Sequence, residues 1–255
     1  MERTRAIALN TFRESIREKL LVIALFFGGI LMASSYMLSP LAVGARSKIM
    51  LDVGLAAISL LGVLTAVMIG GTLLHKEIDR RAVYMVLARP VSRLEYLLGK
   101  FWGILLAISS VVAVMTLVMV ATLLLGRVSM KPVVFAAIYL SLLEVAVICS
   151  VVVLFSTFTT PVLTSFFTLC IFVAGSLSHD LRAFAEKFGG DVMRRVMEVI
   201  FIALPNLKVF DLRHEAVHDL AYSMTDLGMA TLYAVVYAGA ALYIAYLIFS
   251  RREFA

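Results

Sequence analysis

A short pattern of histidines and glutamate, His214-Glu215-Ala216-Val217-His218, matches H-E-x-x-H. On a helix this spacing places two imidazoles on one face beside a glutamate that could activate water, as in zinc proteases. A catalytic zinc needs a third protein ligand, and residues 219–225 contain no further histidine. The nearby carboxylates are Asp211, Asp219 and Asp226. A zinc metalloprotease therefore stays open as an alternative, as does a weaker metal contact through His214 and His218, beside the simpler interpretation as a surface stretch.

A single carboxylate, Glu144, is the only ionisable residue well inside a long apolar run. A charge at the centre of a membrane costs about 2.5–3.5 kcal/mol on insertion scales, so it normally faces a cavity or a partner. Glu144 could bind a cationic substrate, relay a proton or bond to another helix. It is a candidate for a substrate path, and the alternative is a packing residue bonded to Ser141 or Thr65.

A charged segment, residues 75–100, separates two apolar runs and is the third candidate. Its sequence is HKEIDRRAVYMVLARPVSRLEYLLGK. Residues 82–88 favour a helix, Pro90 interrupts it, and residues 91–100 favour a second helix that runs toward the membrane. The segment also carries the apolar residues Tyr84, Met85 and Leu87. Charges beside an apolar face suit docking into a groove of a soluble partner, while the alternative is a basic loop that only fixes orientation.

The elements that carry these residues are expected to be membrane-spanning helices. Of the 255 residues, 62% are hydrophobic and 16% are charged, well below the charged share of soluble domains. Six apolar runs have the length of a span, and without water in the hydrocarbon core they must be helices. The runs are 20–39, 54–74, 101–125, 133–155, 161–177 and 227–249. We expect one all-α membrane domain over residues 1–255.

Lysine and arginine gather before residue 20, in the 75–100 segment and at the end of the chain. By the positive-inside rule, this bias places both termini and the 75–100 segment in the cytoplasm. Residues 2–18 carry Ala6, Ile7, Leu9, Phe12 and Ile16 at helical spacing, which predicts an amphipathic helix on the membrane surface. The outer loop, 178–225, shows a similar pattern over 184–200 and predicts a second amphipathic helix before the last span.

Other classes of function lack their signatures. The net charge of +6 reflects the ends of apolar runs and does not indicate a nucleic-acid partner. Cys149 and Cys170 both lie inside apolar runs, which favours packing over a disulfide. The sequence contains no G-x-x-x-x-G-K-[ST] and no G-x-S-x-G, so neither Walker-type ATP binding nor a serine hydrolase elbow is indicated.

Several stretches resemble the permeases of type-2 ABC exporters. The segment EIDRRAVYMVLARPVSRLEYLLGK is similar to the loop after the second span of that family, with Arg81-Ala82 where Gly-Thr is frequent. FSTFTTP, LPNLKVFDLR and FSRREF are similar to the turn between spans four and five, the outer loop and the C-terminus. The resemblance covers nearly the whole chain and is strongest to the branch for multi-copper enzyme maturation, including the nitrous-oxide reductase maturation permease.

This resemblance implies a non-enzymatic, six-helix permease subunit in a prokaryotic cytoplasmic membrane. Residues 1–19 would form the elbow helix, and 75–100 the coupling helix that a cytoplasmic ATPase dimer engages. ATP and Mg would bind to that partner, with no cofactor in this chain, and a second permease subunit would complete the transporter. The residues expected to couple are Glu77, Arg80, Arg81, Arg89, Pro90 and Arg93. The substrate, the choice between homodimer and heterodimer, and the choice between export and ATP-driven mechanotransmission are not readable from the sequence.

Overall fold

The computed structural model of the chain describes residues 2–38, 46–79, 92–177, 204–218, 220 and 222–251. All regular elements in these residues are helical. They are α1 (Glu2–Ile16), α2 (Lys19–Leu38), α3 (Arg46–Asp79), α5 (Arg93–Leu125), α6 (Pro132–Ser156), α7 (Pro161–Ser176), the 3₁₀ helix η2 (Leu207–Phe210), α10 (Arg213–His218) and α11 (Met224–Arg251). The predicted all-α class is confirmed.

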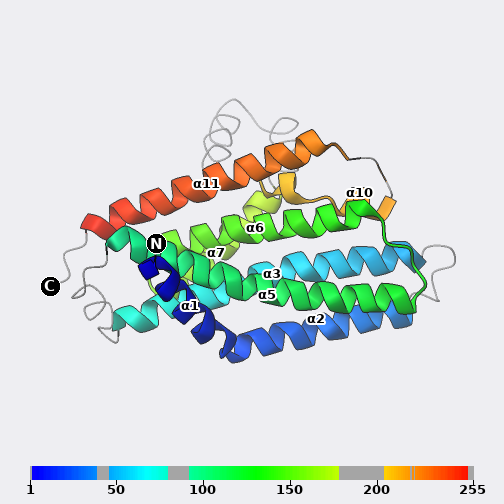
Figure 1. Ribbon diagram of the computed structural model, residues 1–255, viewed down its shortest axis with the longest axis horizontal. Coiled ribbons are helices and arrows are strands. Elements are labelled where there is room, and N and C mark those ends of the chain that lie inside the picture. The colour runs from blue at the N-terminus through cyan, green and yellow to red at the C-terminus, as the bar shows by residue number, and fades with distance from the viewer. Residues whose placement is uncertain are drawn as a thin grey trace, which may run out of the picture.

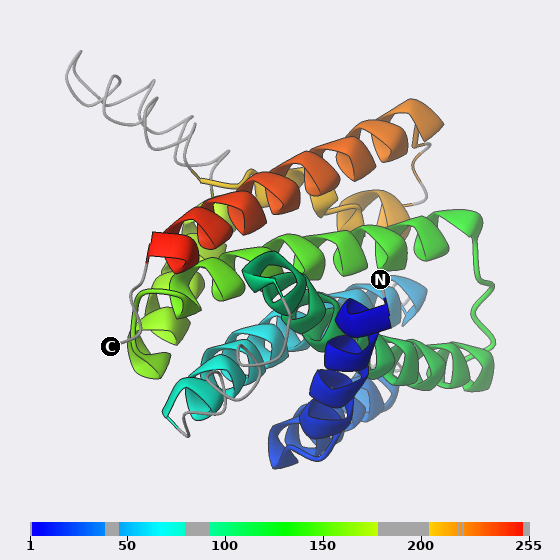
Figure 2. The same cartoon turned by 60° about the vertical axis from the view of Figure 1, so that its left-hand side comes forward.

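The long helices lie side by side along the long axis of the molecule (Figure 1). Helix α1, the start of α5 and the last turn of α11 lie at one end, which we call the termini end. The start of α3, the turn between α5 and α6, and α10 lie at the opposite end, which we call the far end. The two views show α11 and α6 running beside each other along the bundle (Figure 2).

The helices follow the predicted apolar runs, but within the described residues four or five of them, rather than six, have the length and composition of a span. Four helices are long and apolar enough to cross a membrane, and a fifth crossing needs the bent pair Thr4–Ile16 and Leu21–Met37, which meet at 59°. Helix α7 has 16 residues, so at 1.5 Å per residue it is about 24 Å long, shorter than a hydrocarbon core of about 30 Å. The structure therefore supports four to five spans and leaves the sixth as a proposal.

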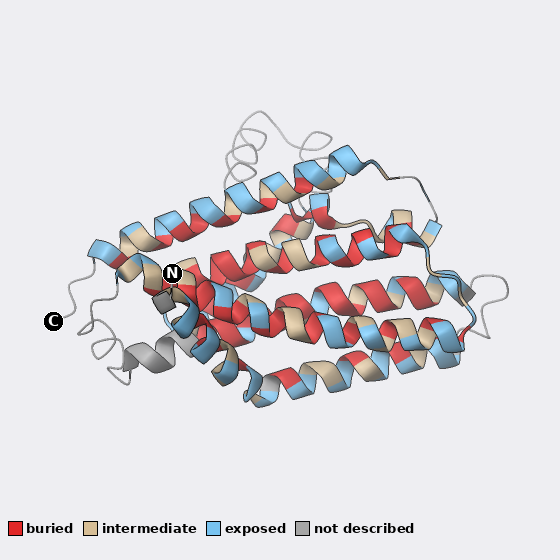
Figure 3. Cartoon of the chain, in the orientation of Figure 1, coloured by how far each residue is buried: buried red, intermediate tan, exposed pale blue. Residues whose placement is uncertain are grey.

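Helix α6 forms the centre of the bundle, with buried residues along most of its length (Figure 3). It packs against α3 and α11, and its run of valines and isoleucines fills the space between them. The outward faces of the peripheral helices are apolar as well. Exposed large apolar residues include Phe26, Phe27, Val162, Phe166, Leu232 and Val235. A continuous exposed apolar belt of this kind is solvated by lipid rather than water.

The predicted N-terminal amphipathic helix is present as α1, and its apolar residues are divided between the bundle and the outside. Ala8, Thr11 and Ser15 are the buried residues, whereas Leu9 and Ile16 are exposed. Helix α1 packs on α5, where Ile7 and the backbone of Ala8 approach Gly99 and Gly103, while Leu9 and Ile16 remain outside, where lipid can cover them. The predicted helix within residues 184–200 lies outside the described residues.

Candidate functional site

Helix α5 begins at a well-defined cap within the charged segment, at Ser92. The side chain of Ser92 accepts a hydrogen bond from the backbone N–H of Glu95, and the Glu95 carboxylate accepts one from the backbone N–H of Ser92. This reciprocal capping box satisfies two N–H groups that a helix start would otherwise leave unpaired. The local sequence S-R-L-E therefore fixes where α5 starts within the charged segment.

Arg93, one of the expected coupling residues, contacts the end of α11. Its Nη1 donates to the carbonyl oxygens of Phe249, at 2.9 Å, and Ser250, at 2.6 Å. A guanidinium at the last carbonyls of a helix satisfies acceptors that lack helical partners and neutralises the negative end of the helix dipole. Tyr96 stacks on Phe249 one turn further along α5, with ring centroids 6.0 Å apart. Arg93 and Tyr96 therefore fasten the start of α5 to the end of α11.

The same stretch of α5 holds α1 through two glycines. Gly99 and Gly103 stand four residues apart on one face, and a Cβ on Gly103 would lie 2.7 Å from the Ala8 carbonyl oxygen. A Cβ on Gly99 would lie 2.7 Å from Cγ2 of Ile7. This close approach is the G-x-x-x-G packing of membrane helices, a pattern readable in the sequence and overlooked in the prediction. Helices α1 and α11 thus both attach to the first three turns of α5.

Lys100 is a buried cation in the same stretch of α5. The sequence indicated it only as part of the charged segment. Its side chain is 1% exposed, and its ammonium lies 5.9 Å from the centroid of the Tyr96 ring. That distance is within reach of a cation–π contact. The i, i+4 spacing of Tyr96 and Lys100 was the available signal, because it places both side chains on one helix face.

The other expected coupling residues lie at or beyond the edge of the described structure. Glu77 belongs to the last turn of α3, whose side chains fall outside the described residues. Arg80, Arg81, Arg89 and Pro90 also lie outside them. Of the six, Arg93 is the one whose side chain the structure describes, and it forms two hydrogen bonds to α11.

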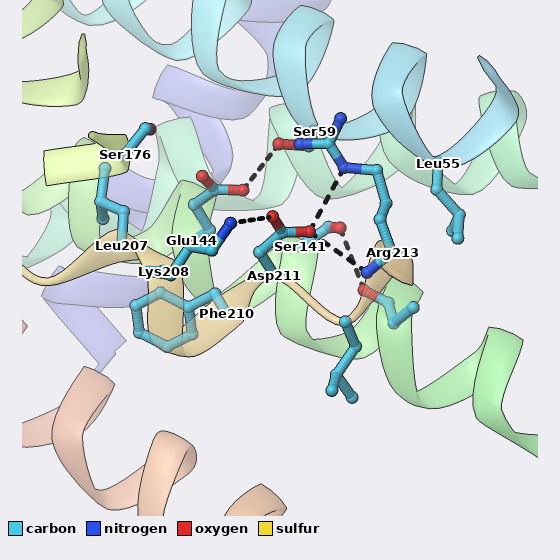
Figure 4. A pocket seen from close by; sticks show the side chains of 12 residues that line it. Leu55, Ser59, Ser141, Glu144, Ser176, Leu207, Lys208, Phe210, Asp211 and Arg213 are labelled. Carbon is cyan, nitrogen blue, oxygen red and sulfur yellow. Dashed lines mark hydrogen bonds and ion pairs between the residues drawn. The ribbon is translucent and has the colours of Figure 1, made fainter. Parts of the chain in front are cut away.

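Glu144 lies where α3 and α6 meet, in a polar site near the outer loop. Its Oε2 accepts a hydrogen bond of 2.7 Å from the hydroxyl of Ser59 on α3 (Figure 4). The partners considered from sequence are wrong, because Ser141 bonds to the Ala137 carbonyl and Thr65 to the Leu61 carbonyl of their own helices. No local spacing could have identified Ser59, which is 85 positions away in the chain.

The segment 207–213 closes this site from above. Lys208 and Arg213 each pair with Asp211, at 3.4 Å from its Oδ2 and Oδ1 respectively, and the backbone N–H of Arg213 donates to Oδ1 at 3.1 Å. All three residues border the same cavity as Ser59 and Glu144 (Figure 4). The cavity volume is about 40 Å³, which has room for a few waters and not for an organic substrate.

The charge arrangement of this site is set by Asp211. Burial alone would raise the pKa of its carboxyl, but the backbone N–H of Arg213 and the charges of Arg213 and Lys208 together hold that pKa below its usual value of 3.8. Asp211 is therefore an anion that orders both cations above Glu144. The stretch LPNLKVFDLR serves as a polar lid on the bundle.

The H-E-x-x-H residues do form a helix, α10, but a short one. The rings of His214 and His218 lie on one face, with centroids 4.3 Å apart, and Nδ1 of His218 is 3.1 Å from the His214 carbonyl oxygen. Among the described residues, no group of three His, Cys, Asp or Glu side chains is placed to hold a metal ion. Asp211 is engaged by cations, and Asp219 lies outside the described part of the chain.

Comparison with known families agrees with this arrangement of helices. The model for the ABC-2 family transporter protein matches residues 5–254. Among curated proteins, no match was found. Because the family model spans nearly the whole chain, from α1 to just beyond α11, this chain belongs to the ABC-2 family of transporter membrane proteins.

Proposed function

We propose that this chain is the transmembrane permease subunit of an ATP-driven ABC exporter, with ATP hydrolysed by a separate cytoplasmic subunit. Family membership supports a non-enzymatic membrane subunit that works with an ABC ATPase. The observation that carries the proposal further is the attachment of α1 and α11 to the start of α5, which lies in the last part of the charged segment.

In this proposal, residues 77–93 receive the motion of the ATPase pair. Arg93 would pass a displacement of the segment to α11, and Gly99 with Gly103 would pass it to α1. Because packed helices move as rigid bodies, three helices would shift together rather than bend one by one. Both termini and the 75–100 segment would face the cytoplasm of a prokaryote, in line with the distribution of lysine and arginine.

The experiment is co-purification with the ATPase encoded beside this chain. Replacing Arg89 and Pro90 together by alanine should abolish complex formation, because both stand in the segment proposed to dock. Arg93→Ala should leave docking largely intact but weaken coupling, since Arg93 contacts α11. Lys19→Ala, which removes an exposed cation outside the segment, is the matched control. An ATPase that fails to bind the wild-type chain, or binds the double variant equally, would contradict the proposal.

Two finer possibilities remain within the family. The complex could drive a partner protein without moving a substrate, as a mechanotransmitter, or belong to the multi-copper enzyme maturation branch that the sequence resembles. Reconstitution in vesicles separates transport from mechanical work, because only an exporter changes the distribution of a substrate. The metalloprotease alternative predicts a different result, namely activity without ATPase that Glu215→Gln abolishes.

A further inference from the structure

The cavity at the far end of the bundle has the make-up of an anion site. Its volume is about 530 Å³, within the range of ligand pockets. The cavity is bordered by α3, the turn between α5 and α6, the start of α6, and α10. Four basic side chains from these separate elements converge on it, namely Lys48, Arg127, Lys131 and His218.

Among the described residues, the acidic side chains nearest in sequence do not line this cavity. Asp52 follows Lys48 by one turn of α3 and is exposed, and Glu215 lies on α10 before the lining residues Ala216 and Val217. Within the described residues, neither Lys48 nor Arg127 forms a hydrogen bond or ion pair through its side chain. The first turns of α3 and α6 also border the cavity, and the positive ends of their dipoles favour an anion there.

Arg127 occupies a backbone position that glycine normally takes. Its φ is 53°, and it is the one non-glycine residue with positive φ in the described chain. Two hydrogen bonds define the turn as a Schellman motif, from Arg127 N–H to the Leu124 carbonyl and from Val128 N–H to the Leu123 carbonyl. Glycine stands one position earlier, at Gly126, so the strained position carries a guanidinium. Such strain is retained where the side chain has a use.

The cavity also has an apolar floor and lies at the edge of the lipid-facing surface. Leu51, Val134 and Val217 line it beside the cations. Immediately before Gly126, Leu124 is 66% exposed and Leu125 is 70% exposed, so the hydrocarbon boundary falls close to the cavity. Cations beside apolar side chains, close to the hydrocarbon boundary, match an amphiphile with an anionic head.

We propose that this cavity binds the phosphate of an anionic phospholipid, with Arg127 and Lys48 as the principal contacts and the apolar floor beneath the acyl-glycerol part. A planar guanidinium binds phosphate oxygens with two parallel hydrogen bonds, and a lysine adds a point charge. The site goes beyond the proposed export function and does not depend on it.

Binding is measured on the purified full chain in detergent, with dioctanoyl phosphatidylglycerol as the probe and dioctanoyl phosphatidylcholine as its zwitterionic counterpart. Wild type should bind the anionic lipid more tightly. Arg127→Gly should weaken that binding about tenfold, the effect of losing one charge-assisted contact. Without lipid, Arg127→Gly should melt no earlier than wild type, because glycine fits the left-handed position.

Two controls make the result decisive. Arg127→Lys keeps the charge and should retain most of the binding, while Arg251→Gln removes an exposed cation at the termini end and should bind as wild type does. Equal affinity for the two lipids, or unchanged binding by Arg127→Gly, would overturn the site. If glycerol phosphate binds as tightly as the lipid and with the same dependence on Arg127, the phosphate site stands but the lipid is wrong as its source.

Discussion

At the scale of single residues, the bond between Ser59 and Glu144 holds α3 to α6 through a buried carboxylate. Ser59→Ala removes the hydroxyl donor and leaves Oε2 of Glu144 without it, which should lower stability by about 1–3 kcal/mol. Ser150→Ala is the matched control, because that buried hydroxyl bonds only to the Val147 carbonyl of its own helix. Thermal unfolding in detergent should therefore show a clear loss for the first variant and little for the second. Equal losses would mean that Glu144 does not depend on Ser59.

Asp211 makes the stability of the fold depend on pH in a predictable direction. Its folded-state pKa is held below 3.8, so the anion stabilises the fold above the unfolded pKa of about 3.9. This contribution is lost as the pH falls through the folded-state value. Asp211→Asn should lower the melting temperature near neutral pH and reduce its further drop below about pH 4.

Replacing Lys208 tests the predicted direction of this pH dependence. Lys208→Met removes one of the charges that hold the pKa of Asp211 down, so the acid-induced loss should begin at a higher pH than in wild type. The measurement is the melting temperature of wild type and of Lys208→Met from neutral to acid pH. A Lys208→Met profile that coincides with wild type would show that the 3.4 Å pair contributes nothing in solution.

At the scale of elements, the crossing of α1 and α5 depends on the missing side chain at Gly103. Gly103→Leu should push α1 off α5, since even a Cβ would lie 2.7 Å from the Ala8 carbonyl oxygen. Overpacking of this kind costs about 1–3 kcal/mol or detaches the helix. Protease access to the N-terminal helix in vesicles, together with the melting temperature, measures the effect.

The same substitution at Gly239, on α11, is the matched control. A Cβ there meets nothing within 4 Å, so Gly239→Leu should be tolerated and even favour the helix. If Gly103→Leu and Gly239→Leu behave alike, the glycines of α5 do not hold α1.

The apolar runs were sufficient to predict most of the helices, because membrane spans are encoded by local composition. The first residue of each helix was harder to predict. Helix α3 begins at Arg46 rather than near residue 54, since polar first turns extend beyond the hydrocarbon core. Helix α1 was predictable from its apolar spacing, but its contact with α5 was not, because that contact depends on the missing side chains of Gly99 and Gly103. The Ser59–Glu144 and Arg93–Phe249 contacts join distant segments, which no periodicity in the sequence reports.

At the scale of the whole molecule, the termini end and the far end carry different features. The termini end joins α1, α5 and α11 at the charged segment, the polar lid covers Glu144 near the middle of α6, and the far end carries the basic cavity. The small volume beside Glu144 means that a substrate path through this helix pair would require the helices to separate. In the proposed exporter, the motion of the ATPase pair at the termini end would have to drive such a separation.

The most direct test of this account is the ATPase rate of the complex reconstituted in lipid nanodiscs. We predict that wild type alters the rate of its partner ATPase, and that the double replacement of Arg89 and Pro90 by alanine removes this effect. Arg93→Ala should reduce it at unchanged complex yield, because the link from α5 to α11 is broken. An ATPase rate that is the same with wild type, with either variant and without the permease would contradict the proposed coupling.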